Sequence, residues 1–182
     1  VESGIDITTT DNERVSLALL KDNVIRLWAS HNQTLEAAKN KKASIVVATK
    51  HAKVNYQLSK KDGYVLLKTN QLALRIYPAP LRFEAYHNDN STPYFKELKP
   101  IELTDKGSTQ TLTSTPNDSY YGGGQQNGQY EFNGKTMEIS YSGGWEEGDR
   151  PSPAPFYMSG NGYGVLRNTW ADGSYDFRSD DY

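Results

Sequence analysis

The stretch AKVNYQLSKKDGYVLLKTNQLALRIY, residues 52–77, decides the fold class of this 182-residue chain. Apolar and polar side chains alternate along it in successive short runs, the pattern of β-strands that bury one face. Asp62-Gly63 lies between two of these runs, and an Asp-Gly pair in this position is a strong signal for a β-hairpin. The stretch therefore predicts neighbouring antiparallel strands joined by tight turns.

The same alternation recurs along the rest of the chain. Asn133-Gly134 separates QYEF from TMEISY, and Asn161-Gly162 separates PFYMS from YGVLRNTW, so both pairs predict further hairpins. The other alternating runs are VSLALL (15–20) and VIRLWA (24–29), separated by the short turn KDN, and LRFEAY (81–86), which ends in a polar turn cluster.

Helical patterns are nearly missing from the sequence. Only Thr34–Lys42 has a helix-like composition, and it is short and polar, so we expect a loop or a single helical turn there. Short strands with turn signals about every 8–12 residues predict an antiparallel β-sandwich or barrel. We expect one all-β domain over residues 1–182.

Composition excludes several classes of partner. The chain has 20 basic and 22 acidic residues and a net charge of −2, so no basic field is available to attract nucleic acid. It has no cysteine, which removes disulfides and thiolate chemistry. No apolar run approaches the ~20 residues of a membrane span. His31, His51 and His87 lack ligand-like spacing, so no metal site is predicted, and no cofactor is indicated.

The segment YYGGGQQNG, residues 120–128, combines three adjacent glycines with three amide side chains. It lacks the glycine spacing and the lysine of a phosphate-binding loop, so nucleotide binding is rejected. The glycines fit a β-bulge or a tight corner. The amides of Gln125, Gln126 and Asn127 both donate and accept hydrogen bonds, as recognition of sugar hydroxyls requires.

Residues 143–155 are rich in glycine and proline and predict a long loop. Trp145 lies in it beside Glu146, Glu147 and Asp149, a set that could contact a sugar through the ring face and the carboxylates. The alternative is a solvated acidic loop with Trp145 folded back on the sheet. Adjacent glutamates point to opposite faces and are poorly placed for a retaining glycosidase pair ~5–5.5 Å apart, so no catalytic residue is predicted.

Four segments, in order, resemble the N-terminal domain of glycoside hydrolase family 31, the α-glucosidase-like enzymes. The strand pair in PFYMSGNGYGVLRNTW is the most specific of them, and the resemblance covers roughly Asn23 to Phe177. The segments are DNVIRLWAS (22–30), QLALRIYPAPLRFEAYHNDN (71–90), YYGGGQQNG (120–128) and PFYMSGNGYGVLRNTW (155–170).

The resemblance implies a galactose-mutarotase-like β-sandwich that precedes a (β/α)8 barrel. In such enzymes the barrel carries both catalytic aspartates, so the chain is expected to be an N-terminal fragment that lacks the barrel and is inactive alone. A loop of the sandwich reaches over the barrel mouth, where the carbohydrate substrate is shared. By position, this loop implies substrate contacts from Tyr141, Ser142, Gly143, Gly144, Trp145, Glu146 and Glu147.

Two departures from the family pattern bear on the sugar. Gln125 stands where the family usually has a glutamate, and Gly143-Gly144 replaces an aspartate. An anionic contact is lost and space is gained, so we expect a different or bulkier sugar than plain α-glucose. The alternatives to this interpretation are a stand-alone carbohydrate-binding module or a purely structural interaction domain. An extracellular or cell-surface bacterial location is favoured over a cytoplasmic one.

Overall fold

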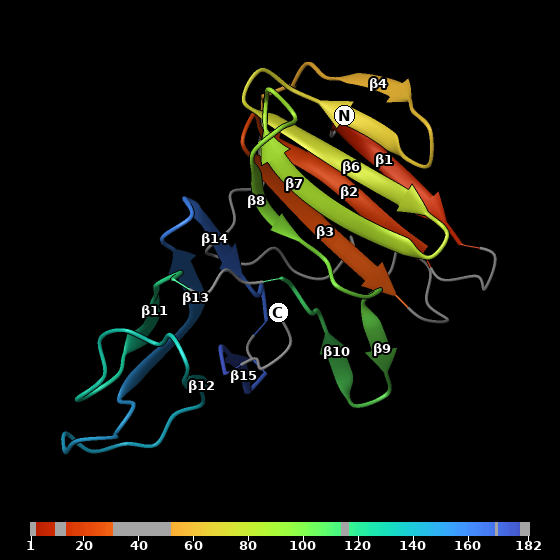
Figure 1. Cartoon of the computed structure of the whole chain (residues 1–182). Coiled ribbons are helices and arrows are strands. Elements are labelled where there is room, and N and C mark those ends of the chain that lie inside the picture. The colour runs from red at the N-terminus through yellow and green to blue at the C-terminus, as the bar shows by residue number, and fades with distance from the viewer. Residues whose placement is uncertain (1–2, 10–13, 31–51, 114–116, 170, 179–182) are drawn as a thin grey trace. The chain divides into compact units, whose positions relative to one another are not determined.

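The computed structural model describes residues 3–9, 14–30, 52–113, 117–169 and 171–178, and the expectation for Thr34–Lys42 falls outside them. The described residues form antiparallel sheets and contain no helix, which confirms the all-β fold (Figure 1). The chain divides into two compact units, Val1–Thr113 and Ser114–Tyr182.

All the strands are short, as the spacing of the turn signals predicts. In chain order they are β1 (Ser3–Thr8), β2 (Arg14–Lys21), β3 (Val24–Ser30), β4 (Gln57–Lys60), β5 (Val65–Lys68), β6 (Leu72–Pro78), β7 (Leu81–His87), β8 (Pro93–Lys96), β9 (Glu102–Thr104), β10 (Gly107–Thr109), β11 (Tyr120–Gln125), β12 (Thr136–Ile139), β13 (Ser152–Ser159), β14 (Tyr163–Leu166) and β15 (Gly173–Asp176).

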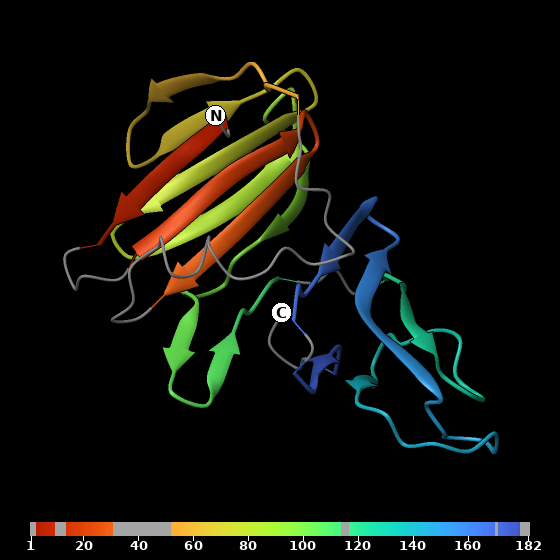
Figure 2. The ribbon, with the colours of Figure 1, turned by 180° about the vertical axis from the view of Figure 1, so that it is seen from behind.

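The first unit is a β-sandwich. One sheet has the order β1-β2-β3 and the other β4-β5-β6-β7-β8, and Figures 1 and 2 show them as two layers from opposite sides. Leu17 and Leu19 of β2 pack between the layers against Leu74 and Phe83 of the larger sheet. Burial of these side chains is the main stabilising contribution to this unit, because each fully buried leucine or phenylalanine is worth roughly 2–3 kcal/mol.

Hairpins form where two of the dipeptide signals predict them. Gly63 joins β4 to β5 and Gly162 joins β13 to β14, and both have a positive φ, 80° and 85°. Glycine adopts this conformation without the steric cost that other residues incur. The turn between β2 and β3 and the polar turn after β7 are also confirmed.

The hairpin predicted at Asn133-Gly134 is wrong. The dipeptide forms a turn, but the segment before it is not a strand, and β12 pairs with β15 instead. The Gly134 N–H donates to the Phe177 carbonyl at 3.0 Å, so the turn is held by the chain's later segment. The alternation of polar and apolar residues in QYEF covers only four residues. It does not distinguish a strand from a loop that buries Phe132.

The long loop predicted for residues 143–155 ends earlier than expected, because β13 begins at Ser152. Pro153 and Pro155 are part of this strand. A proline fixes φ and lacks the N–H donor, but the Pro155 carbonyl still accepts from Arg167 N at 2.9 Å and from the Tyr175 hydroxyl at 2.8 Å.

The second unit contains the sheets β11-β13-β14 and β12-β15. Its core is mostly aromatic: the Tyr157 ring meets Tyr175 edge-on at 4.8 Å and Phe177 at 5.1 Å. Burial raises the pKa of the Tyr157 hydroxyl. In β11 the register shifts between Gly122 and Gly124, which confirms the bulge predicted for the glycine segment.

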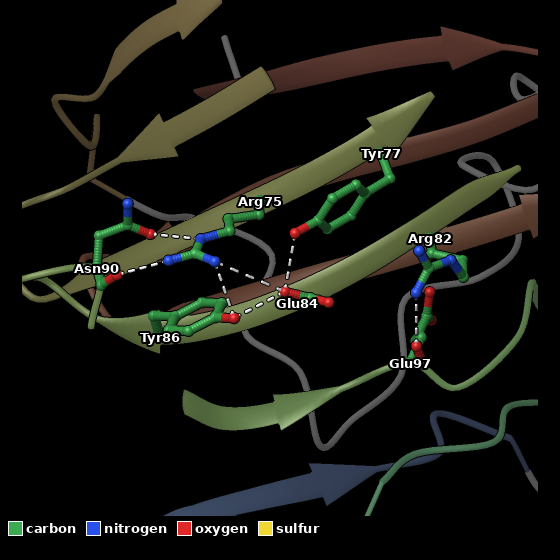
Figure 3. A network of polar contacts seen from close by, with 7 residues as sticks. All are labelled: Arg75, Tyr77, Arg82, Glu84, Tyr86, Asn90 and Glu97. Carbon is green, nitrogen blue, oxygen red and sulfur yellow. Dashed lines mark hydrogen bonds and ion pairs between the residues drawn. The ribbon is translucent and has the colours of Figure 1, made fainter. Parts of the chain in front are cut away.

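A polar network covers the outward face of β6 and β7 in the first unit (Figure 3). Arg75 donates from Nε to Asn90 Oδ1 at 2.8 Å and from Nη2 to the Asn90 carbonyl at 2.7 Å. The Glu84 carboxylate accepts hydroxyl hydrogen bonds from Tyr77 at 3.1 Å and from Tyr86 at 2.7 Å. The network therefore ties the two strands to the turn that follows β7.

Candidate functional site

The loop between β12 and β13 contains all seven residues that the family resemblance implies as sugar contacts. Its two ends are joined by hydrogen bonds: Ser142 N donates to the Arg150 carbonyl at 3.3 Å, and Arg150 N donates to Ser142 Oγ at 2.7 Å. The Arg150 guanidinium also donates from Nε to the Ser140 carbonyl at 3.1 Å. The loop is thus closed at its base rather than extended into solvent as a free segment.

Asp149 organises the tip of this loop. Its carboxylate accepts from Glu146 N at 2.9 Å, and its own N–H donates to the Glu146 carbonyl at 3.1 Å. Gly143, Gly144 and Gly148 all have a positive φ, between 70° and 89°. The tip therefore depends on glycine at these positions, because a side chain there would strain the backbone.

The loop is paired with the corner that follows β11. Asn127 N donates to the Asp149 carbonyl at 3.0 Å, and Gly148 N donates to the Asn127 carbonyl at 3.0 Å. A Cβ added at Gly128 would lie 2.6 Å from Cγ of Glu147, so the two segments are closely packed. The two stretches that the sequence singled out separately are neighbours in the structure.

Gln126 fixes the corner itself. Its Nε2 donates to the Gly123 carbonyl at 2.9 Å and to the Glu138 carbonyl at 3.0 Å, which links β11 to β12. The Nδ2 of Asn127 is buried and has no hydrogen-bond partner among the described residues. A buried donor without an acceptor costs free energy, and because protein covers this atom it is not open to a ligand.

The aromatic side chains around the loop point into solvent. Trp145 is 78% exposed, and Tyr141 and Tyr130 are exposed as well. The alternative in which Trp145 folds back on the sheet is wrong. Glu146 and Glu147 are also exposed, so their carboxylates are available to accept hydrogen bonds. Chemically, the loop can offer an aromatic face and carboxylate acceptors, the two kinds of group that suit a sugar.

Two structural residues of this unit were missed at the sequence level. Arg150 closes the loop, and its only signal is that it is the single cation in an acidic segment. Asp118 is buried and accepts from Ser159 Oγ at 2.6 Å and from Asn161 Nδ2 at 3.0 Å, which holds the β13–β14 turn. Nothing in the sequence around Asp118 marks it for this role.

Glu131 and His87 make contacts that hold the fold together. Glu131 accepts backbone hydrogen bonds from Tyr120 N at 3.2 Å and Asn133 N at 2.7 Å. His87 stacks on Tyr94 with ring centroids 4.1 Å apart, whereas His31 and His51 lie outside the described residues. Within the described ranges, no group of three or more possible ligands could hold a metal ion, and no helix could span a membrane.

Comparison with known families identifies the domain. The family model of the glycosyl hydrolase 31 N-terminal galactose mutarotase-like domain matches residues 14–176. The chain belongs to this family. The match includes both compact units, the glycine corner after β11 and the loop between β12 and β13, so the galactose-mutarotase-like β-sandwich inferred from the sequence is confirmed.

Solved structures of family 31 enzymes have the same fold. The GH31 dextranase of Flavobacterium johnsoniae, complexed with glucose, matches 99% of this chain with a TM-score of 0.80 at 17% identity, over 23% of its own chain. A GH31 α-xylosidase from a soil metagenome, complexed with xylose, matches 98% with a TM-score of 0.71 at 17% identity, over 29% of its chain. The Xanthomonas citri GH31 α-xylosidase matches 94% with a TM-score of 0.67 at 16% identity, over 19% of its chain.

The present chain thus spans less than a third of the length of these enzymes, as expected of one domain among several. At such low identity the likeness concerns the fold and not the substrate. Among curated proteins, none matches the sequence significantly.

Proposed function

We propose that this domain is the non-catalytic N-terminal sandwich of a retaining α-glycosidase and that it completes the sugar pocket of a (β/α)8 barrel. The barrel would supply both catalytic carboxylates, and the domain would supply the loop between β12 and β13. Membership of family 31 and the much greater length of the matched enzymes support this assignment.

The observation that carries the proposal is the loop itself, which is rigidly held at its base and exposed at its tip. Hydrogen bonds from Arg150 and Asn127 fix the backbone of the loop, while the ring of Trp145 remains 78% exposed. A held loop binds with a lower entropic cost than a loop that must become ordered. An exposed tryptophan on such a loop can cover the C–H face of a sugar in a pocket made with the barrel.

The glycine pair bears on which sugar is recognised. Gly143-Gly144 stands where family members often have an aspartate, and the Asp149 carboxylate fills the space that a side chain at Gly144 would need. The Asp149 carboxylate therefore accepts a hydrogen bond from Glu146 N within the loop. We expect a sugar different from, or bulkier than, plain α-glucose, such as a galacto-configured or N-acetylated one. Equal turnover of ordinary α-glucosides by the enzyme that contains this domain would rule this out.

The function is tested by comparing two lengths of chain with chromogenic aryl α-glycosides. The 182-residue chain should hydrolyse none of them, whereas the chain extended through the barrel should be active. In the extended chain, Trp145→Ala should raise KM more than it lowers kcat, since it removes binding and leaves the reacting groups in place. Measurable turnover by the 182-residue chain would defeat the proposal.

A stand-alone carbohydrate-binding module is the second candidate, and the exposure of Tyr130, Tyr141 and Trp145 favours it. Titrating the 182-residue chain with mono- and oligosaccharides while following tryptophan fluorescence distinguishes the two functions. Saturable binding that Trp145→Ala abolishes and Trp28→Phe retains would support the module. Failure to bind favours the first proposal, because half of a pocket holds sugar poorly.

A further inference from the structure

A second surface of the Ser114–Tyr182 unit differs from the loop between β12 and β13, because its exposed side chains are mainly apolar. In β13 and β14 the side chains alternate strictly: Tyr157 and Val165 pack in the core, whereas Met158 and Leu166 point outward. Phe156 lies on the same outward side and is partly exposed. The sheet β11-β13-β14 therefore has large apolar side chains on both faces.

The outward side chains form one continuous patch. Phe156 pairs with Leu166 and Met158 pairs with Gly164 across the two strands, and Tyr121 of β11 is the partner of Met158 on the other side. A Cβ added at Gly164 would lie 3.0 Å from a ring carbon of Phe156, so this ring lies close over the glycine backbone.

Tyr130, whose ring centroid is 5.6 Å from that of Tyr121, extends the patch beyond the strand. We call the five side chains Tyr121, Tyr130, Phe156, Met158 and Leu166 the Met158 face.

The Met158 face has the character of an interface. None of its five members is charged, whereas soluble surfaces normally mix charged groups among apolar ones. Met158 is 50% exposed and Leu166 is 41% exposed, so water contacts apolar area on neighbouring strands. A contiguous apolar area of this kind marks a site where something else packs.

We propose that the Met158 face is buried against the remainder of a family 31 enzyme, that is, against enzyme chain outside residues 1–182. The proposal rests on the function proposed above and names the surface through which the domain meets its partner. The matched enzymes are several times longer than this chain, so most of their structure lies outside the matched domain. A large tethered partner is therefore expected for such a face.

A second copy of the chain fits the Met158 face less well. A stable dimer typically buries about 800 Å² on each partner. A whole aromatic side chain has roughly 150–250 Å² of surface, so five side chains of which only Tyr130 is mostly exposed present about a few hundred Å². Two domains of one chain are covalently linked, so their contact does not have to offset the translational and rotational entropy that separate partners lose. A smaller apolar contact is therefore sufficient.

The two methionines of the chain provide a test that needs no mutation. Met158 is half exposed, and Met137 is fully buried in the core. Hydrogen peroxide converts an accessible methionine to the sulfoxide, which peptide mass spectrometry quantifies. In the 182-residue chain Met158 should oxidise at least tenfold faster than Met137. In the chain extended through the barrel, Met158 oxidation should slow at least tenfold, and Met137 serves as the internal control for unfolding.

The outcomes separate this proposal from the function it rests on. Equal Met158 oxidation rates in an extended chain that hydrolyses α-glycosides would overturn the docking surface and leave the function standing. Slow Met158 oxidation already in the 182-residue chain would also overturn it, whether sedimentation gives a monomer or a dimer, because the face would be covered without the barrel. An extended chain without glycosidase activity would count against the proposed function.

A matched pair of leucine variants gives an independent measurement. Leu166→Lys and Leu98→Lys each place a charge at a leucine that is about half exposed, 41% and 51%. In the extended chain, Leu166→Lys should lower the Tm and increase protease cleavage between the domain and the barrel, while Leu98→Lys should do neither. The same Tm for both variants in the extended chain would contradict burial of the Met158 face.

Discussion

The Asp149 carboxylate occupies the space beside Gly144 where a side chain at position 144 would have to lie. A Cβ on Gly144 would collide with Oδ2, the atom that accepts the hydrogen bond from Glu146 N. Gly144 also has a φ of 70°, which a residue with a side chain rarely adopts. The loop tip therefore requires the absence of a side chain for two separate reasons.

Gly144→Ala should destabilise the loop through both effects. Gly148→Ala is the matched control, because Gly148 has a φ of 89° but nothing near its missing Cβ. The backbone strain should cost each variant about 1–2 kcal/mol, and only Gly144→Ala should also disturb the Asp149 contact. Limited proteolysis of the loop, together with urea unfolding, measures the difference. If both variants behave alike, the carboxylate does not constrain position 144.

Gln126→Glu should be more harmful than Gln126→Ala. The Gln126 amide donates to the carbonyls of Gly123 and Glu138. Alanine removes these hydrogen bonds at a cost of about 1–2 kcal/mol, whereas a glutamate cannot donate and would set a negative charge beside two carbonyl oxygens. Thermal unfolding of the two variants and of the exposed control Gln125→Glu checks the order. Equal stability of the Ala and Glu variants would show that the donor role is unimportant.

The sequence predicted the strands from β2 to β7, because burial of one face produces both the alternating pattern and the strand, whereas it did not predict β1, β8, β9 and β10. In β6, Leu74 and Ile76 are buried between the layers while Arg75 and Tyr77 point outward. The alternation of side chains between the two faces is therefore visible in the sequence as a period of two residues. The turns at Gly63 and Gly162 were predictable for a similar reason, since the backbone conformation itself demands glycine.

Interactions between distant segments were not predictable in the same way. Backbone hydrogen bonds pair Asn127 with Asp149 and Gly134 with Phe177. Because almost every residue carries these backbone groups, the residue types do not predict the pairing. The extent of the second unit's strands was misjudged for this reason. The position of the loop could be inferred from its glycines and prolines, while its role in contacting sugar stays a prediction.

Arg75→Met should destabilise the first unit substantially. The guanidinium donates hydrogen bonds to the side-chain and backbone oxygens of Asn90. It also lies 4.0 Å from the Glu84 carboxylate, which is largely buried. Breaking a fully buried pair costs about 3–5 kcal/mol, and because the Arg75 side chain is 22% exposed we expect about 2 kcal/mol.

Arg75→Lys separates charge from geometry in this network. An ammonium keeps the charge but cannot contact Asn90 and Tyr86 with the planar set of donors that the guanidinium provides. We expect Lys to recover less than half of the lost unfolding free energy in urea titrations. The exposed Arg178, paired with Asp176, is the control, and Arg178→Met should leave the stability unchanged. Full recovery by Lys would mean that the charge alone matters.

Glu97 should make the stability of the first unit depend on pH. It is fully buried, and its carboxylate accepts from Phe83 N at 2.7 Å and from Gln110 Nε2 at 2.6 Å. Burial raises the pKa of Glu97 above its usual value, although the two hydrogen bonds oppose the shift. The folded state therefore holds the proton more tightly than the unfolded state does.

The sign of the dependence follows from proton binding. Between the unfolded pKa, about 4.5, and the higher folded pKa, the folded state binds more protons, so the free energy of unfolding falls as the pH rises through this window. Glu97→Gln keeps the shape and the neutral charge of the protonated form, and rotation of the Gln110 amide lets it accept from the new side chain. The variant should lose the fall in stability with rising pH and match or exceed the wild type at pH 7. Urea unfolding from pH 4 to pH 7, with the exposed Glu102→Gln as control, measures it, and parallel curves for wild type and Glu97→Gln would refute the assignment.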